Sequence, residues 1–284
     1  MTGEHHVGIL GAGVMGTGIT QCIAQAGIPV TIVDTDRAAL ERARRDLRSA
    51  LRLSVLLGRG PKAADVADIV ARVHWSDRIE DLGAVSFVIE SVTERLELKR
   101  ALFAELDRVC APAAVFATGT SAIPVADLAA RTSRGDRVLG LHFMNPAPLT
   151  ETVEVITSAQ TAPAALNRAL ALLDALGKKG IVVGDGPGFV INRVLMLSIA
   201  EAAAITADGT DAATIDDLFE GCLGHRMGPL RTADLIGLDN VADTLVVLRE
   251  TTGDSRYRVP EALAELVAAG HLGRKTGRGF HAYP

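Results

Sequence analysis

The 284-residue chain is poor in cysteine and in aromatic side chains, and it has no long uninterrupted apolar run. Its three cysteines are odd in number, and their spacing matches neither a zinc site nor a CxxC redox pair, so we expect free thiols and no metal site. The longest apolar stretch, residues 189–207, is interrupted by Asn192, Arg193 and Glu201. It therefore predicts a core helix and no membrane span.

The chain also has no excess of positive charge, since 34 acidic residues outnumber 29 basic ones. The formal net charge is -5 at pH 7, with a sequence pI of about 5.8, which argues against nucleic acid as a partner because phosphate backbones require a basic surface. The apolar segment after His6 is too short for the core of a signal peptide, so we expect a cytoplasmic protein. With 48% hydrophobic and 22% charged residues, the composition is that of a globular protein with a sizeable core.

Short apolar runs alternate with helical patterns in the first two thirds of the chain, and only helical patterns follow residue 185. Strand-like runs are expected at 7–10, 30–33, 85–92, 115–117, 138–143, 153–156 and 180–183. The expected architecture is α/β: a Rossmann-like, doubly wound domain over residues 1–184, with a helical arm at about 38–72. A smaller all-helical domain, with four helices, is expected over residues 185–284.

A glycine-rich turn links the first expected strand to the first expected helix. It has the form G-x-G-x-x-G, and an acidic residue, Asp34, ends the next strand 34 − 11 = 23 residues later. Glycines permit the tight turn, the close approach of a pyrophosphate and the close packing of helix on strand, while the helix N-terminus favours negative charge. The turn residues expected at the cofactor are Gly11, Gly13, Val14, Met15 and Gly16.

Asp34 is expected to accept hydrogen bonds from the adenosine ribose. A carboxylate at this position repels a 2′-phosphate and favours NAD over NADP, although Arg37 lies close enough in sequence to soften that preference. FAD is an alternative dinucleotide for the same turn.

Several further motifs occur in a fixed order along nearly the whole chain. They are Ile89–Glu94 with Lys99, His142–Pro146, Pro187–Arg193, Met227–Pro229, Ala233–Asp239 and Leu272–Phe280. Together with the glycine turn, they make the chain resemble the 3-hydroxyacyl-CoA dehydrogenase family. The resemblance implies oxidation of a 3-hydroxyacyl thioester with NAD, or the reverse reaction.

The resemblance assigns the catalytic histidine to His142 and its carboxylate partner to Glu154. The chemistry supports the pair independently, because oxidation of a 3-hydroxyl needs a base that is neutral near pH 7, and the resulting imidazolium needs a carboxylate. His142 closes one expected strand and Glu154 lies on the next, so a sheet would bring them together.

Other site residues follow from the resemblance alone. Ser121 would bind the substrate 3-oxygen, and Asn192 would orient the substrate or the nicotinamide. Glu94 and Lys99 would contact the nicotinamide ribose, although a solvated helix charge is the alternative for Lys99. Lys62, near the end of the helical arm, would meet a phosphate of CoA.

Some positions depart from the family pattern. Gly119 and Ala122 flank Ser121 where asparagine and serine are usual, and Arg226 replaces a usual proline. Residues 149–152 are also more polar than is usual. These departures suggest an alternative substrate, a glyceryl or other hydroxyacyl group on an acyl carrier protein, as used for polyketide extender units.

The resemblance also implies a homodimer formed through the helical domain, whose short helices offer little isolated core. Two other interpretations remain open. A β-hydroxyacid dehydrogenase of the 6-phosphogluconate type would need an interdomain lysine where this chain has Asn192 and Arg193. A non-catalytic NAD-binding relative would not need His142, Glu154 and Ser121.

Overall fold

The computed structural model describes residues 6–56 and 65–283, and the chain divides into two compact units. The first comprises Met1–Thr120 and Pro124–Asp185, and the second comprises Ser121–Ile123 and Gly186–Pro284. The segment 121–123 therefore groups with the second unit although it lies inside the sequence of the first.

One eight-stranded sheet forms the centre of the first unit, with strand order β3-β2-β1-β4-β5-β6-β7-β8. Neighbouring strands are parallel except for β6 and β7, which are antiparallel. This confirms the expected doubly wound α/β class. The strands are β1 (Val7–Leu10), β2 (Val30–Val33), β3 (Val73–Ser76), β4 (Phe87–Glu90), β5 (Val115–Thr118), β6 (Val138–His142), β7 (Thr152–Thr157) and β8 (Lys179–Gly184).

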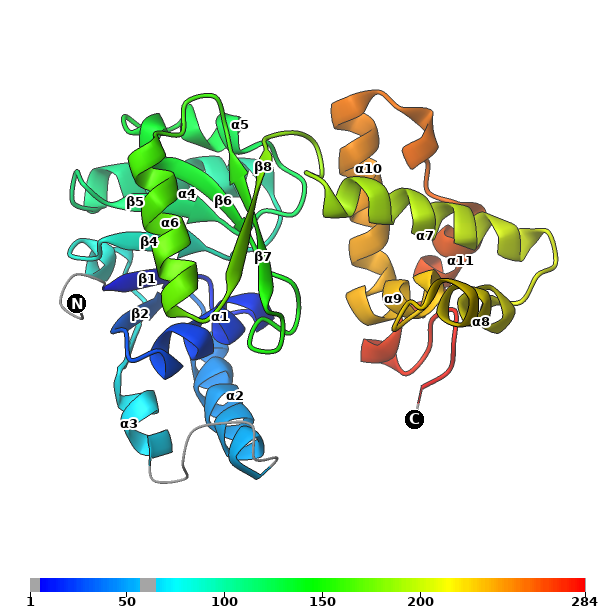
Figure 1. Ribbon diagram of the computed structural model, residues 1–284, viewed down its shortest axis with the longest axis horizontal. Coiled ribbons are helices and arrows are strands. Elements are labelled where there is room, and N and C mark those ends of the chain that lie inside the picture. Colours follow the sequence, from blue (N-terminus) through cyan, green and yellow to red (C-terminus); the bar gives the residue numbers. More distant parts are fainter. Residues whose placement is uncertain (1–5, 57–64, 284) are drawn as a thin grey trace. The chain divides into compact units, whose positions relative to one another are not determined.

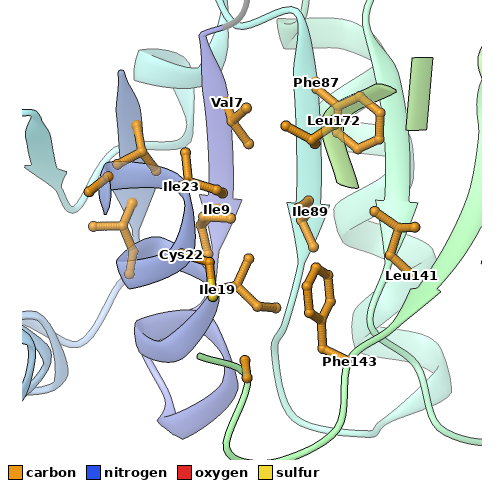
Figure 2. Close-up of a cluster of buried hydrophobic side chains, with 14 of the residues drawn as sticks. Val7, Ile9, Ile19, Cys22, Ile23, Phe87, Ile89, Leu141, Phe143 and Leu172 are labelled. Carbon is orange, nitrogen blue, oxygen red and sulfur yellow. The ribbon is translucent and has the colours of Figure 1, made fainter. Parts of the chain in front are cut away.

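Helices connect and cover these strands (Figure 1). They are α1 (Val14–Gln25), α2 (Arg37–Leu56), α3 (Val66–Ala71), α4 (Leu96–Val109), α5 (Val125–Ala129) and α6 (Pro163–Ala175). Alternate residues of each strand point to the same face, so Val7 and Ile9 share one face with Ile89. Figure 2 shows Ile19 and Ile23 of α1 against this face, in a cluster that is almost completely buried.

The opposite face of the sheet has its own aromatic contact. Phe116 on β5 meets Phe103 on α4 edge to face, with ring centroids 6.2 Å apart. Arg134 lies over the same Phe116 ring, 5.0 Å from its centroid. Both faces of the sheet are thus covered, which explains the nearly continuous apolar runs of β1, β2, β4 and β5.

One strand was not expected from the sequence. β3 pairs in parallel with β2 at the edge of the sheet. Its sequence, Val-His-Trp-Ser, buries only Val73 and Ser76, and His74 between them is exposed. An edge strand half open to solvent has no continuous apolar run, so hydrophobic patterning alone misses it.

The second unit is helical in its described part, but the expectation of four helices is wrong. The structure has α7 (Ile191–Ala207), α8 (Ala212–Leu223), α9 (Pro229–Ile236), α10 (Leu238–Thr252) and α11 (Glu261–Ala268). The unexpected helix is α9, which has only eight residues and starts at Pro229. Its proline resembles a loop signal in sequence, yet proline is favoured at the first position of a helix.

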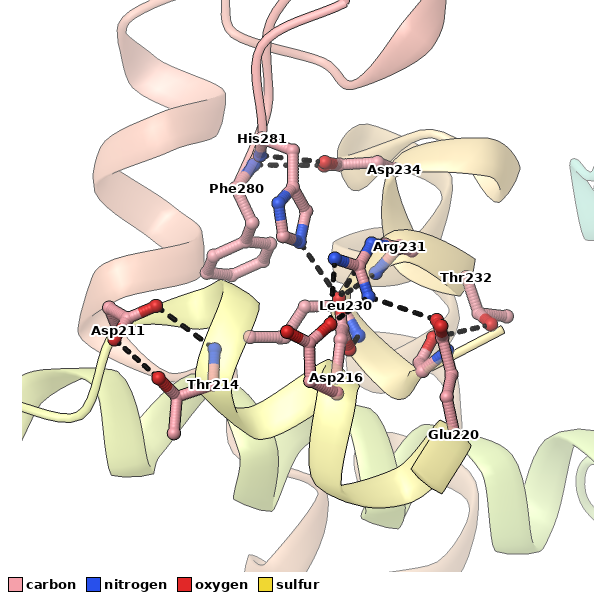
Figure 3. Close-up of polar contacts among 12 residues, drawn as sticks. Asp211, Thr214, Asp216, Glu220, Leu230, Arg231, Thr232, Asp234, Phe280 and His281 are labelled. Carbon is pink, nitrogen blue, oxygen red and sulfur yellow. Dashed lines mark hydrogen bonds and ion pairs between the residues drawn. The ribbon is translucent and has the colours of Figure 1, made fainter. Parts of the chain in front are cut away.

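Two buried aspartates tie the second unit together (Figure 3). Asp216 of α8 has no exposed surface and accepts hydrogen bonds from the backbone N–H groups of Leu230 and Arg231 in the first turn of α9. His281 Nε2 lies 2.8 Å from Asp216 Oδ2. Asp234 of α9 accepts from the backbone N–H groups of residues 280 and 281. These carboxylates therefore fix both the start of α9 and the end of the chain.

Candidate active site

The glycine turn has the geometry that a pyrophosphate needs. Gly11 has a φ of 106°, and a Cβ there would lie 2.6 Å from the Ser91 carbonyl oxygen. A Cβ on Gly16 would collide with the Gly11 carbonyl oxygen, whereas one on Gly13 would meet nothing within 4 Å. Gly11 and Gly16 are thus required by packing, and Gly13 leaves open space at the N-terminus of α1. The residues present fit a dinucleotide phosphate at this position.

Asp34 is held beside this turn. One carboxylate oxygen accepts from the Ala12 N–H at 2.8 Å, and the other accepts from the Asp36 N–H at 2.9 Å. The nearby Arg37 forms a 2.6 Å ion pair with Asp77. Arg37, the cation that would weaken a preference for NAD over NADP, is therefore already paired with the Asp77 carboxylate.

The turn lies at the point where the strand order reverses. β1 has β2 on one side and β4 on the other. The chain builds the sheet outward from β1 through β2 to β3, then returns to the other side of β1 and continues from β4. In open α/β sheets, ligands bind beyond the carboxyl ends of the strands at such a switch point. Glu94 and Lys99 both follow β4, one of the two strands at the switch.

Lys99 is not a solvated helix charge, and that alternative is wrong. Its side chain is 1% exposed, and its Nζ lies 2.6 Å from Glu90 Oε1 and 3.2 Å from Glu94 Oε2. Glu94 is 35% exposed at its side chain. Sequence reasoning did not single out Glu90, although an acidic residue ending a fully buried strand is a signal that would have identified it.

His142 and Glu154 form a buried pair across the antiparallel ladder. They are direct partners in the register of β6 and β7. His142 Nδ1 lies 2.9 Å from Glu154 Oε2, and the two side chains are 7% and 5% exposed. With the carboxylate ionised, this bond requires the proton on Nδ1, which leaves the Nε2 lone pair to accept a proton. The arrangement suits general-base chemistry.

Ser121 and Asn192 are brought together within the second unit. The Asn192 side-chain amide donates to the Ser121 carbonyl oxygen at 2.9 Å, and Asn192 is 9% exposed. The two residues expected to contact the substrate are therefore joined by one hydrogen bond, which the Ser121 main chain accepts. Lys62 lies outside the described residues.

The helical arm contains a hollow of about 650 Å³ between α2 and α3. Arg48 and Arg52 line it together with apolar side chains. Basic and apolar groups in one recess suit an anionic ligand that also has an apolar portion.

Within residues 6–56 and 65–283, no group of histidine, cysteine and acidic side chains is arranged to hold a metal ion. Among the helices in these same residues, none has the length and apolar character needed to cross a membrane.

Comparison with known proteins shows two family models that together match nearly the entire chain. The model for the 3-hydroxyacyl-CoA dehydrogenase NAD binding domain matches residues 6–186, and that for the C-terminal domain of the same enzymes matches residues 188–283. A probable 3-hydroxybutyryl-CoA dehydrogenase of Bacillus subtilis is 38% identical over 276 residues, covering 97% of this chain and 96% of the relative.

Solved structures agree with this match. The (S)-3-hydroxybutyryl-CoA dehydrogenase PaaH1 from Ralstonia eutropha is similar with a TM-score of 0.91 and 39% identity, with 99% of each chain covered. FadB2 of M. tuberculosis gives a TM-score of 0.94 at 36% identity, with 98% of each chain covered.

Proposed function

Because this chain belongs to the 3-hydroxyacyl-CoA dehydrogenase family, we propose that it interconverts 3-hydroxyacyl-CoA and 3-oxoacyl-CoA with NAD as the hydride carrier. The observation on which this rests most directly is the buried 2.9 Å pair of His142 and Glu154. Short acyl chains are favoured, since the relatives at 35–38% identity include several named 3-hydroxybutyryl-CoA dehydrogenase.

His142 is the proposed base. Nε2 takes the proton of the substrate 3-hydroxyl as the C3 hydride leaves, and the C–O single bond becomes the carbonyl. The imidazolium that forms is stabilised by the ionised Glu154, which also fixes the proton on Nδ1. NAD, when bound, supplies the hydride acceptor. In the reverse direction His142 returns the same proton to the oxygen.

The other site residues bind and orient the substrate and the cofactor. The Ser121 hydroxyl donates to the substrate 3-oxygen, and the Asn192 amide holds the Ser121 main chain in place. The glycine turn of Gly11, Gly13 and Gly16 receives the pyrophosphate, with Val14 and Met15 at the helix N-terminus. Asp34 receives the adenosine ribose, and Glu94 is assigned to the nicotinamide ribose, with the buried Lys99 3.2 Å behind its carboxylate. The basic hollow of the arm, beside Lys62 in the sequence, is assigned to the CoA.

A spectrophotometric assay tests this function. Purified protein is mixed with NADH and acetoacetyl-CoA, and the loss of NADH absorbance is followed. Rapid turnover that disappears in His142→Gln, while NADH still binds, is the expected result. His74→Gln is the matched control, because His74 is an exposed histidine of the same unit. Full turnover in His142→Gln would refute the assigned base, and no NADH binding by the parent protein would refute the function.

A carrier-bound substrate is the second candidate. It is favoured by the family departures at Gly119, Ala122 and Arg226 and by the polar sequence of residues 149–152, in which Leu149 is 75% exposed. Tight NADH binding without turnover of acetoacetyl-CoA, followed by reduction of NAD with a glyceryl-loaded acyl carrier protein, would establish it. Failure of every carrier-bound hydroxyacyl group would eliminate it.

We also propose that the protein is a cytoplasmic homodimer assembled through the helical unit. Apolar side chains on α7 and α8 support this, since Val194, Leu218 and Leu223 are each more than half exposed in the single chain. Sedimentation equilibrium tests it, and a monomer at micromolar concentration would refute the dimer.

A further inference from the structure

A closed ring of hydrogen bonds and ion pairs lies in the first unit beside the strand switch point, and the buried Glu90 is one of its members. Glu90 ends β4 and has no exposed surface. One carboxylate oxygen, Oε1, accepts from Lys99 Nζ at 2.6 Å and from the Val92 N–H at 2.7 Å. The other, Oε2, accepts from Thr118 Oγ1 at 2.7 Å. Glu90 thereby holds the ends of two loops, the one after β4 and the one after β5.

The ring closes through the partners of Glu90. Lys99 Nζ also lies 3.2 Å from Glu94 Oε2, and Thr118 Oγ1 accepts from the Thr120 N–H at 2.8 Å. The Thr120 hydroxyl in turn donates to Glu94. Starting from Glu90, the ring therefore runs through Lys99, Glu94, Thr120 and Thr118 and returns to Glu90.

The members of this ring differ in their access to solvent. Glu90, Thr118 and Thr120 are completely buried, and Lys99 is 1% exposed. Glu94 is 35% exposed at its side chain, so it is the member of the ring that a ligand can reach. The carboxylates of Glu90 and Glu94 share the ammonium group of Lys99. A buried ammonium that loses one of its two carboxylate partners attracts the remaining carboxylate more strongly.

We propose that Glu90 is a positioning residue for the cofactor site: it neutralises Lys99 and anchors Thr118, so that Glu94 keeps its partly exposed position at the rim of the ring to receive the nicotinamide ribose. This inference rests on the proposed function, because it assumes that Glu94 meets the dinucleotide. Glu90 itself does not touch the cofactor. Without the charge of Glu90, Glu94 is the one carboxylate left beside the Lys99 ammonium, and the present 3.2 Å ion pair tightens and moves the Glu94 carboxylate away from the ligand.

The location of the ring determines which part of the cofactor is sensitive to it. Glu90 follows β4, whereas the pyrophosphate and adenosine contacts come from the glycine turn after β1 and from Asp34 after β2. A ligand that ends at the second phosphate, such as ADP, uses only the glycine turn and Asp34. NADH in addition carries the ribose that Glu94 receives.

Glu90→Gln tests the proposal, with NADH and ADP affinities measured by calorimetry on the full chain. The Kd for NADH is expected to rise about tenfold or more, the usual size for a misplaced hydrogen bond to a charged group. The Kd for ADP is expected to stay within about twofold, because the adenosine side is untouched. Glu97→Gln, an exposed carboxylate on α4, is the matched control and leaves both affinities unchanged.

A double-mutant cycle separates positioning from general damage. In a Glu94→Gln background, Glu90→Gln should add little further loss of NADH affinity, since the group it positions is already altered. If the two losses are independent and add, or if ADP binding weakens in parallel with NADH binding, Glu90 has only a structural role and the proposal is overturned.

Thr118→Val provides a second route if Glu90→Gln does not fold. It keeps the shape of the side chain but removes the bond to Glu90 and the acceptor for the Thr120 N–H, so weaker NADH binding with unchanged ADP binding is again expected. Normal NADH affinity in Thr118→Val would overturn the proposal. Absence of NADH binding by the parent protein would instead refute the proposed function, and the two failures are therefore distinguishable.

Discussion

Glu154→Gln is the substitution that tests the buried acid–base pair most directly. In the parent protein, the carboxylate accepts the Nδ1 proton of His142 at 2.9 Å. A glutamine amide has nearly the same shape but carries no charge, and its N–H₂ group can donate to Nδ1. That would move the imidazole proton to Nε2, the atom proposed to accept the proton of the substrate hydroxyl.

The size of the effect follows from the charge that Glu154 places beside the imidazolium. Two unit charges ~4 Å apart attract by about 4 kcal/mol at an effective dielectric constant of ~20. Both side chains are nearly inaccessible to solvent, so water does little to replace that attraction. At about 1.4 kcal/mol for each factor of ten, kcat is expected to fall roughly a thousandfold.

Steady-state oxidation of NADH with acetoacetyl-CoA measures this change, and thermal unfolding shows whether the variant is folded. Glu151→Gln is the control, since Glu151 precedes the same strand with an exposed side chain. Little change in NADH affinity is expected. If Glu154→Gln retains kcat within about tenfold of the parent while His142→Gln is inactive, the charge of Glu154 is not needed and the electrostatic reasoning is refuted.

Three other predictions concern stability and cofactor choice. Asp216→Ala removes the acceptor of two backbone N–H groups at the start of α9, so we expect a loss of about 3 kcal/mol or more in the free energy of unfolding, measured by chemical denaturation; a loss below about 1 kcal/mol would contradict this. Burial and a hydrogen bond to Asp234 raise the pKa of Tyr283 from 10.0 to about 12. The unfolded chain thus releases this proton first, and the contribution of Tyr283 to stability, complete below pH 10, disappears as the pH rises towards 12. The melting temperature of Tyr283→Phe should therefore fall less between pH 10 and pH 12 than that of the parent protein. An equal fall in both proteins would refute a raised pKa for Tyr283. Asp77→Asn releases Arg37 from its ion pair, and the KM for NADP should fall by about two- to fivefold relative to that for NAD, as expected for an exposed pair; an unchanged ratio would show that Arg37 does not reach the 2′-phosphate.

Hydrophobic patterning predicted most of the first unit because β1, β2, β4, β5 and β6 are buried at every position. β1 and β2 occupy the predicted residues, and the expected strand pairing of His142 with Glu154 is present in the register of β6 and β7. That geometry was predictable because two consecutive strands joined by a short connection usually pair.

Other features were beyond sequence reasoning for identifiable physical reasons. β3 lies at the sheet edge and alternates polar with apolar residues over only four positions. The role of Glu90 depends on partners 9 and 28 positions further along the chain, which meet it only after the sheet has formed. Contacts of this kind depend on tertiary packing, and local propensity does not determine them.

The antiparallel pairing of His142 with Glu154 also has an evolutionary consequence. The two residues are attached to a rigid ladder, and the nine residues 143–151 connect its two strands. Phe143 and Ala147 of this connector are buried in the core, whereas Leu149 and Glu151 are exposed. Replacements at the exposed connector positions leave the ladder register intact, whereas a shift of one position within β7 would turn Glu154 to the other face of the sheet. The exposed positions of the connector, such as Leu149 and Glu151, are therefore free to diverge under selection for new substrates while the geometry of the histidine–carboxylate pair is inherited unchanged.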